Sequence, residues 1–136
     1  MKATAKWIEK LAFDTVSDNG HTVRMDTTAA GGSLDSGMSP KKMVLGALSV
    51  CSGMDVVGIL QKMRVAFTKM EIEAEAEQTD KDPKVFREIH MVYRCDVAPG
   101  DQEKLEKAIR LSHDTYCGIS AMLKKHCAIT HSVELI

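Results

Sequence analysis

The sequence predicts an α+β fold with a mostly antiparallel sheet, and three observations support this. Segments in which apolar and polar residues alternate, typical of strands, occur near both ends and in the middle of the chain. One long, nearly all-apolar segment between them is too long for a strand. The resulting order is three strands, a helix, two strands, two helices and a strand, so that strands neighbouring in sequence are expected to pair. The 136 residues contain no repeat or linker, so residues 1–136 are expected to form one domain.

The first part of the chain predicts a three-stranded meander followed by a loop. Strands are expected over Lys2–Trp7, from about Leu11 to Val16, and over His21–Asp26, where apolar and polar residues alternate. Ser17–Gly20 forms a hairpin turn, because its Asn-Gly pair accepts positive φ. The glycine-rich stretch Thr27–Ser39 is expected to be a flexible loop.

The segment from Pro40 to Arg64 is predicted to be a long buried helix. Ser39 suits the N-cap and Pro40 suits the first helical position. A helix of this length would span roughly 36 Å at about 1.5 Å per residue, which makes it a candidate for crossing a membrane. Asp55 within it would be costly in a bilayer, and three glycines interrupt it. Burial in a core or a large interface is therefore favoured, and no membrane is expected.

The second half predicts two more strands, two helices and a last strand. Glu71–Glu77 alternates acidic and apolar residues, and Asp80–Pro83 makes the turn. The next strand places one set of residues on its apolar face: Val85, Ile89, Met91, Tyr93, Cys95 and Val97. Asp101 is expected to cap a helix with Leu105, Ala108, Ile109 and Ser112 on its inner side. A short helix from about Cys117 to Lys125 and a strand over Ala128–Ile136 complete the chain.

Composition and charge exclude several classes of protein. The formal net charge is −1, so nothing favours nucleic acid or an anionic membrane surface as a partner. The first residues lack the apolar core of a signal peptide. Four cysteines are too sparse for a secreted disulfide scaffold. A cytoplasmic location with reduced thiols is expected.

Two cysteines in unlike settings are the most informative feature. Cys51 lies in the middle of the long apolar segment, and Cys117 lies where one helical pattern ends and another starts. Neither has a second cysteine at C-x-x-C spacing, so zinc-finger and thioredoxin interpretations lose their usual support. A buried thiol and a thiol at a helix N-terminus should differ in reactivity, and the helix dipole is expected to lower the pKa of Cys117. A peroxidatic and a resolving cysteine need such an asymmetry.

The sequence around both cysteines resembles the OsmC/Ohr family (osmotically inducible protein C and organic hydroperoxide resistance proteins). Residues 39–51, SPKKMVLGALSVC, are similar to the first-cysteine helix of that family, and residues 116–120, YCGIS, to its second-cysteine motif. The order of strands and helices agrees over the whole chain. Residues 55–62, DVVGILQK, and residues 129–132, ITHS, resemble the YhfA-like branch most.

The resemblance implies a fold, an assembly and a reaction. It implies an OsmC-like intertwined homodimer with mostly antiparallel sheets and the long helices at its centre, and it places the two cysteines close together. It implies thiol-dependent reduction of organic hydroperoxides, with dithiols such as lipoylated proteins as reductants and no cofactor or metal. In this mechanism Cys51 attacks the peroxide and Cys117 resolves the sulfenic acid, although the reverse assignment stays open. Cys95 and Cys127 are expected to be structural.

One departure from the family pattern concerns the activation of Cys51. Peroxidases of the family place a glutamate one or two positions after the proline of Ser-Pro, where it orients an arginine against the reactive cysteine. Here Lys41 and Lys42 occupy those positions. Arg24 is the candidate for the arginine, although its strand pattern places it on a polar face.

Two other classes of function stay open. His113 and Cys117 are four residues apart, and the pair His126-Cys127 is nearby in sequence, a set that could bind a soft metal such as zinc. A methionine-lined pocket completed by a dimer could instead hold an acyl or other apolar ligand without catalysis.

Overall fold

The computed structural model describes all residues from Met1 to Ile136. The chain divides into two compact units, residues 1–44 and residues 45–136. Each unit is described by itself below, and the expectation of a single domain stays a prediction.

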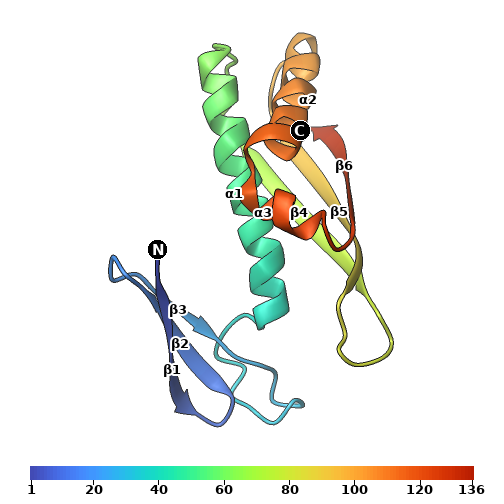
Figure 1. Cartoon of the computed structure of the whole chain (residues 1–136). Helices are drawn as coiled ribbons and strands as arrows, with labels where there is room; N and C mark the ends of the chain where they lie inside the picture. Colours follow the sequence, from blue (N-terminus) through green and yellow to red (C-terminus); the bar gives the residue numbers. More distant parts are fainter. The chain divides into compact units, whose positions relative to one another are not determined.

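The first unit contains a three-stranded antiparallel sheet, drawn in blue in Figure 1. Its strands follow the order β1-β2-β3, with bounds β1 Ala3–Glu9, β2 Ala12–Ser17 and β3 Thr22–Met25. The hairpin between β2 and β3 is confirmed: Gly20 has φ +90°, and its N–H donates to the Ser17 carbonyl over 3.0 Å. The meander predicted from alternation is therefore present, with strand ends shifted by a residue or two.

Asp26 anchors the loop that follows β3. Its buried carboxylate accepts the N–H of Thr27 at 2.7 Å, the N–H of Ser36 at 3.0 Å and the hydroxyl of Ser36 at 2.7 Å. Burial opposes ionisation, but these donors and the Ser33 hydroxyl hold the pKa of Asp26 well below its usual range. The loop predicted to be flexible is thus organised around one carboxylate.

The second unit is built on a sheet of strand order β4-β5-β6, with bounds β4 Met70–Gln78, β5 Phe86–Cys95 and β6 Ala128–Leu135. The pair β4–β5 is antiparallel, whereas β5–β6 is parallel. The mostly antiparallel arrangement is confirmed for the two sheets together, with this one parallel pair as the exception. A parallel pair needs a long crossover, and the helical segment between β5 and β6 supplies it.

That crossover contains more helical pieces than the sequence predicted. It comprises η1 Pro99–Asp101, α2 Gln102–Leu111, the π-helical turn η2 Ser112–Tyr116 and α3 Gly118–Leu123. Asp101 occupies the N-cap position of α2 as expected, but its side chain makes no cap hydrogen bond and instead pairs with Lys104 at 2.7 Å. The π-helical turn carries α2 to Cys117, whose N–H closes it on the Ser112 carbonyl at 2.8 Å.

The core of this unit lies between the sheet and two helices. The long helix α1, Pro40–Lys62, contributes Leu48, Val56 and Leu60, and α2 contributes Leu105, Ala108 and Ile109. Both helices pack on the face of β5 that carries Ile89, Met91, Tyr93 and Cys95, and Figure 1 shows both on that side of the sheet. The predicted phase is therefore confirmed from Ile89 to Val97 and wrong for Val85, which precedes the strand and is exposed. On its opposite face Arg94 pairs with Glu71, Glu73 and Glu134 at 2.7–3.2 Å.

Much of the surface of α1 has no cover within the chain. The helix is long and apolar enough to cross a membrane by length and composition, yet only 28% of its most apolar window is buried. A single such helix is weak support for a membrane span, because core helices of soluble proteins have the same properties. Val50 and Met54 are its most exposed large apolar residues, at 61% and 73%.

Candidate functional site

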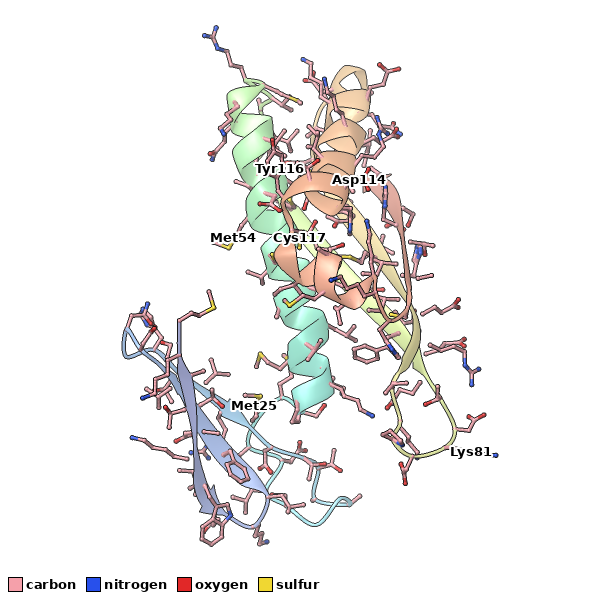
Figure 2. The ribbon with its side chains drawn as sticks, viewed as in Figure 1. Met25, Met54, Lys81, Asp114, Tyr116 and Cys117 are labelled. Atoms are coloured by element: carbon pink, nitrogen blue, oxygen red, sulfur yellow. The ribbon has the colours of Figure 1, made fainter.

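The two cysteines singled out by the sequence meet in the second unit. Cys51 lies halfway along α1 and is half-buried, whereas Cys117 is the N-cap of α3 and is 2% exposed. Figure 2 shows Cys117 on the segment that joins the π-helical turn to α3, beside α1. Cys51 lies close enough to Cys117 to raise the pKa of that thiol, and both cysteines are free. A disulfide between them would form by oxidation of one thiol and attack by the other.

The environment of Cys117 favours the neutral thiol. Burial raises the pKa of Cys117, and its contact with Cys51 adds to this effect. The N–H of Ser120 at the start of α3 donates to the Cys117 sulfur at 3.4 Å and acts in the opposite direction. The expected lowering of the Cys117 pKa by the helix dipole is thus present but outweighed, and the net direction predicted from the sequence is wrong.

A chain of buried polar side chains lies next to the thiol pair. Tyr93 of β5 is its centre: the phenol oxygen is 2.6 Å from the hydroxyl oxygen of Ser52 on α1 and 2.9 Å from Nε2 of His113. Ser112 extends the chain, with its hydroxyl oxygen 3.0 Å from Ser52 Oγ and 3.0 Å from Asp55 Oδ2. At the other end, Nδ1 of His113 is 3.0 Å from the hydroxyl of Ser120 on α3.

The titratable members of this chain are strongly perturbed by burial. Desolvation raises the pKa of Tyr93 to about 12 and lowers the pKa of His113 to about 4. The imidazole of His131 stacks on that of His113 with ring centroids 5.3 Å apart. Tyr93 and His113 are therefore neutral at physiological pH and act as hydrogen-bonding groups.

The sequence indicated only parts of this chain. Tyr93 and Ser112 were placed correctly toward the interior, and His113 was noted only as a possible metal ligand. No spacing rule joins residues from α1, β5 and the π-helical turn. The one available signal was a pair of polar residues, Ser52 and Asp55, inside an otherwise apolar helix.

Two cavities border α1 near Cys51. One, of about 400 Å³, is lined by Ser49, Val50, Gly53, Met54, Val57, Met70 and Ile72. The other, of about 440 Å³, is lined by Met54, Asp55, Gly58, Ile59, Lys62, Met63, Leu111 and Tyr116. Met54 borders both, one helical turn from Cys51, and its side chain projects away from the sheet (Figure 2). Neither lining includes a cysteine. The mostly apolar walls do include Val50, which precedes Cys51 on α1, and Met54.

The remaining cysteines lie in the core. Cys95 is fully buried on the inner face of β5, and Cys127 is 8% exposed. Burial raises the pKa of both thiols. Their placement agrees with the expectation that they are structural.

Arg24 and the two lysines that stand at the positions of the family glutamate lie in the first unit. Arg24 of β3 donates from Nε and Nη2 to the two carboxylate oxygens of Asp14, and its Nη1 lies 3.4 Å from the Ser36 hydroxyl. Its guanidinium is therefore engaged within its own sheet and loop. Lys41 and Lys42 are exposed in the first turn of α1.

The residues proposed as metal ligands do not form a ligand set. Both ring nitrogens of His113 are hydrogen-bonded, to Tyr93 and Ser120. Nε2 of His126 lies 3.1 Å from the carbonyl oxygen of Phe86. The structure contains no group of three or more His, Cys, Asp or Glu side chains that could hold a metal ion.

Comparisons with known proteins identify the family. The sequence model described as OsmC-like protein matches residues 31–132. Protein YhfA of Escherichia coli strain K12 is 36% identical over 136 residues, covering 100% of this chain and 98% of its own. A solved structure described as "structural genomics" has a TM-score of 0.87 and 34% identity, covering 100% of this chain and 98% of that one.

Named hydroperoxide resistance proteins are more distant. The organic hydroperoxide resistance protein OhrB of Bacillus subtilis aligns with a TM-score of 0.69 and 16% identity, covering 98% of both chains. This similarity shows a common fold only. The chain belongs to the OsmC-like family, with its curated relatives in the YhfA branch.

Proposed function

We propose that this OsmC-like protein is a thiol-dependent organic hydroperoxide reductase that uses Cys51 and Cys117. The observation that carries the proposal is the proximity of a half-buried thiol on α1 to a buried thiol at the start of α3. Mostly apolar cavities on either side of Met54 suit the organic part of a hydroperoxide. The fold shared with hydroperoxide resistance proteins adds support.

The geometry suits a reaction in two steps. The thiolate of Cys51 attacks the O–O bond, an S–O bond forms, and the leaving alkoxide takes up the proton that Cys51 released. The sulfur of Cys117 then attacks the sulfenic acid, the S–S bond forms, and the proton of Cys117 leaves with the hydroxide as water. A dithiol, such as the lipoyl group of a lipoylated protein, reduces the disulfide by exchange and is itself oxidised to a disulfide.

The neutral state of Cys117 supports this division of roles. The raised pKa of Cys117 suits a resolving thiol that stays protonated until Cys51 has been oxidised. Lys41 and Lys42 stand where peroxidases of the family carry glutamate, and Arg24 is engaged by Asp14. An arginine–glutamate pair therefore has no part in the proposed mechanism.

A second copy of the chain is part of the proposal. Val50 and Met54 expose apolar surface beside the 400 Å³ cavity on α1. Removing such surface from water is worth about 25 cal/mol per Å², so a homodimer that covers this face is favoured. The substrate would then lie in a pocket closed by the second copy, in a cytoplasm that keeps thiols reduced.

Steady-state turnover tests the proposal. Purified protein with dihydrolipoamide should consume cumene hydroperoxide catalytically, and Cys51→Ser should abolish the consumption. Cys95→Ser is the matched control, because it removes a thiol of the same unit that lies outside the Cys51–Cys117 pair. A wild-type protein that consumes no organic hydroperoxide with any dithiol would exclude this function.

Non-catalytic binding of an acyl or other apolar ligand is the second candidate. The 400 Å³ cavity favours it, because its walls are mostly apolar and contain no titratable group. Saturable binding of a fatty-acid probe that is lost in Met54→Lys, together with no peroxide turnover, would favour this candidate over the enzyme.

A further inference from the structure

The hydrogen bonds in the chain of buried polar side chains beside the thiols all run in one donor-to-acceptor direction. This direction follows from counting the protons that each side chain can donate. The hydroxyl of Ser112 lies 3.0 Å from both Ser52 Oγ and Asp55 Oδ2, but it has only one proton to donate. Since a carboxylate can only accept, Ser112 donates to Asp55 and accepts from Ser52.

The same counting fixes the remaining members. Ser52 has donated its proton, so it accepts from the Tyr93 hydroxyl at 2.6 Å. Tyr93 in turn accepts from Nε2–H of His113 at 2.9 Å, which leaves Nδ1 to accept the hydroxyl of Ser120 at 3.0 Å. Every donor then has one acceptor, and His113 is the neutral Nε2–H tautomer, in agreement with its lowered pKa. No buried side-chain N or O atom is left unpaired.

The chain is fastened to both cysteines. Ser52 directly follows Cys51 on α1. The backbone N–H of Cys117 donates to the Ser112 carbonyl at 2.8 Å, and the Cys117 sulfur accepts the N–H of Ser120 at 3.4 Å. Each cysteine is thus adjacent to a member of the chain, and no member belongs to the thiol pair itself.

We propose that Tyr93 is the positioning residue of the thiol pair, because its hydroxyl joins the helix that carries Cys51 to the π-helical turn and α3 that hold Cys117. Tyr93 reaches the chain from β5, a third element, and is fully buried. It is the only member hydrogen-bonded both to α1 and to His113. The use of this arrangement in catalysis rests on the proposed function. The placement of the two thiols by Tyr93 does not depend on whether a peroxide is reduced.

Positioning by Tyr93 should give the Cys51 thiol a high effective concentration relative to the Cys117 thiol. Tyr93→Phe keeps the ring and removes the oxygen, so the Nε2–H of His113 loses its acceptor and Ser52 loses its donor. The elements that carry Cys51 and Cys117 then lose their link through Tyr93 and keep only the direct one that Ser112 makes to Ser52 and Asp55. The effective concentration of the pair should fall about tenfold, the order expected for one lost buried hydrogen bond.

The measurement is an equilibrium titration in glutathione redox buffers. Each protein is equilibrated across a range of glutathione ratios, quenched with acid, and its Cys51–Cys117 disulfide is quantified by mass spectrometry. Tyr116→Phe is the matched control, because it makes the same chemical change at the other tyrosine of the chain, which is exposed and next to Cys117. Ile109→Val controls for general loss of stability, since it removes core volume but none of the hydrogen-bonded polar side chains. If Tyr93→Phe fails to fold, Ser52→Ala removes the partner of Tyr93 on α1 instead, while Ser112 keeps its bond to Asp55.

The results separate this inference from the proposed function. The inference predicts that Tyr93→Phe lowers the effective concentration while Tyr116→Phe and Ile109→Val leave it unchanged. An unchanged value in Tyr93→Phe, an equal fall in Ile109→Val, or no disulfide in the wild-type protein overturns the inference. A wild-type protein that shows the Tyr93 effect but reduces no hydroperoxide refutes the proposed function alone.

Discussion

At the scale of single residues, the two thiols differ in their access to solvent. Cys117 is shielded and held as a neutral thiol, whereas Cys51 is half-buried at the middle of α1. The thiolate is the reactive form of cysteine, so these features favour the proposed assignment, in which Cys51 attacks first. The two thiols differ as expected, but in the opposite sense: Cys117 is the more buried of the two, and burial raises its pKa.

This asymmetry predicts the order of alkylation. Iodoacetamide at neutral pH should label Cys51 at least about tenfold faster than Cys117, because shielding and a raised pKa both slow the reaction of Cys117. Cys95 should label slowly as well, since it is fully buried. Peptide mapping after timed quenching measures the rates, and rapid native labelling of Cys117 or Cys95 would contradict the placement.

His113 predicts a loss of stability in mild acid. Burial lowers its pKa to about 4, with His131 and Lys124 acting in the same direction and Asp114 opposing. An unfolded histidine titrates near about 6.5, so between these values the unfolded state binds a proton that the folded state does not. The contribution is therefore complete above about pH 6.5 and falls by up to about 3 kcal/mol as pH drops toward 4.

Urea unfolding at several pH values measures this effect. His113→Gln can keep a donor toward Tyr93 without a titrating ring, so its stability should depend less on pH over that window. His21→Gln is the control, because His21 is exposed in the first unit. Equal pH dependence in the wild type and His113→Gln would show that His113 is not the responsible group.

At the scale of elements, the sequence predicted the features that depend on neighbouring residues, such as the phase of a strand and the start of a helix. The alternation around Ile89 and Met91 gave the phase of β5 correctly, and Ser39-Pro40 gave the start of α1. The parallel pairing of β5 with β6 was missed, because pairing direction depends on how the crossover returns and not on alternation. The π-helical turn was missed because one extra residue in a helical turn leaves no periodic signal.

The candidate site was predictable only in its cysteines. Their motifs singled out Cys51 and Cys117, but the polar chain depends on contacts over long separations. Ser52 meets Tyr93 across 41 residues and Ser112 across 60. In the sequence these residues resemble ordinary polar positions of helices and strands. Their function as a unit emerges only when three elements pack together.

The loop of the first unit makes a prediction about Gly37. A Cβ atom at this position would lie 2.6 Å from the backbone oxygen of Arg24, a distance that requires the backbone to move. Gly37→Ala should therefore destabilise the protein by about 1–3 kcal/mol, the usual cost of overpacking. Gly100→Ala is the matched control, because its Cβ would meet nothing within 4 Å. Urea titration of both variants tests this, and equal stabilities would show that the loop is not packed against β3 as described.

At the scale of the whole molecule, the exposed apolar face of α1 predicts a homodimer. Sedimentation equilibrium at micromolar concentration should give the mass of two chains. Met54→Lys should shift the protein toward the monomer, because it places a charge where the second copy is expected to pack. Val85→Lys, a change at an exposed apolar residue between β4 and β5, should leave the dimer intact. A stable folded wild-type monomer would refute the dimer and the closed substrate pocket together.

The most direct test of the two-cysteine mechanism is intact-mass analysis of the serine variants after one equivalent of cumene hydroperoxide. The mechanism predicts that Cys51→Ser gains no oxygen. It predicts that Cys117→Ser reacts once at Cys51 and then progresses to sulfinic acid, because the resolving thiol is absent. The wild type should instead become lighter by about 2 Da, because two hydrogens are lost when the Cys51–Cys117 disulfide forms. Sulfinic acid in Cys51→Ser with none in Cys117→Ser would invert the roles, and no oxidation in either variant would contradict the mechanism itself.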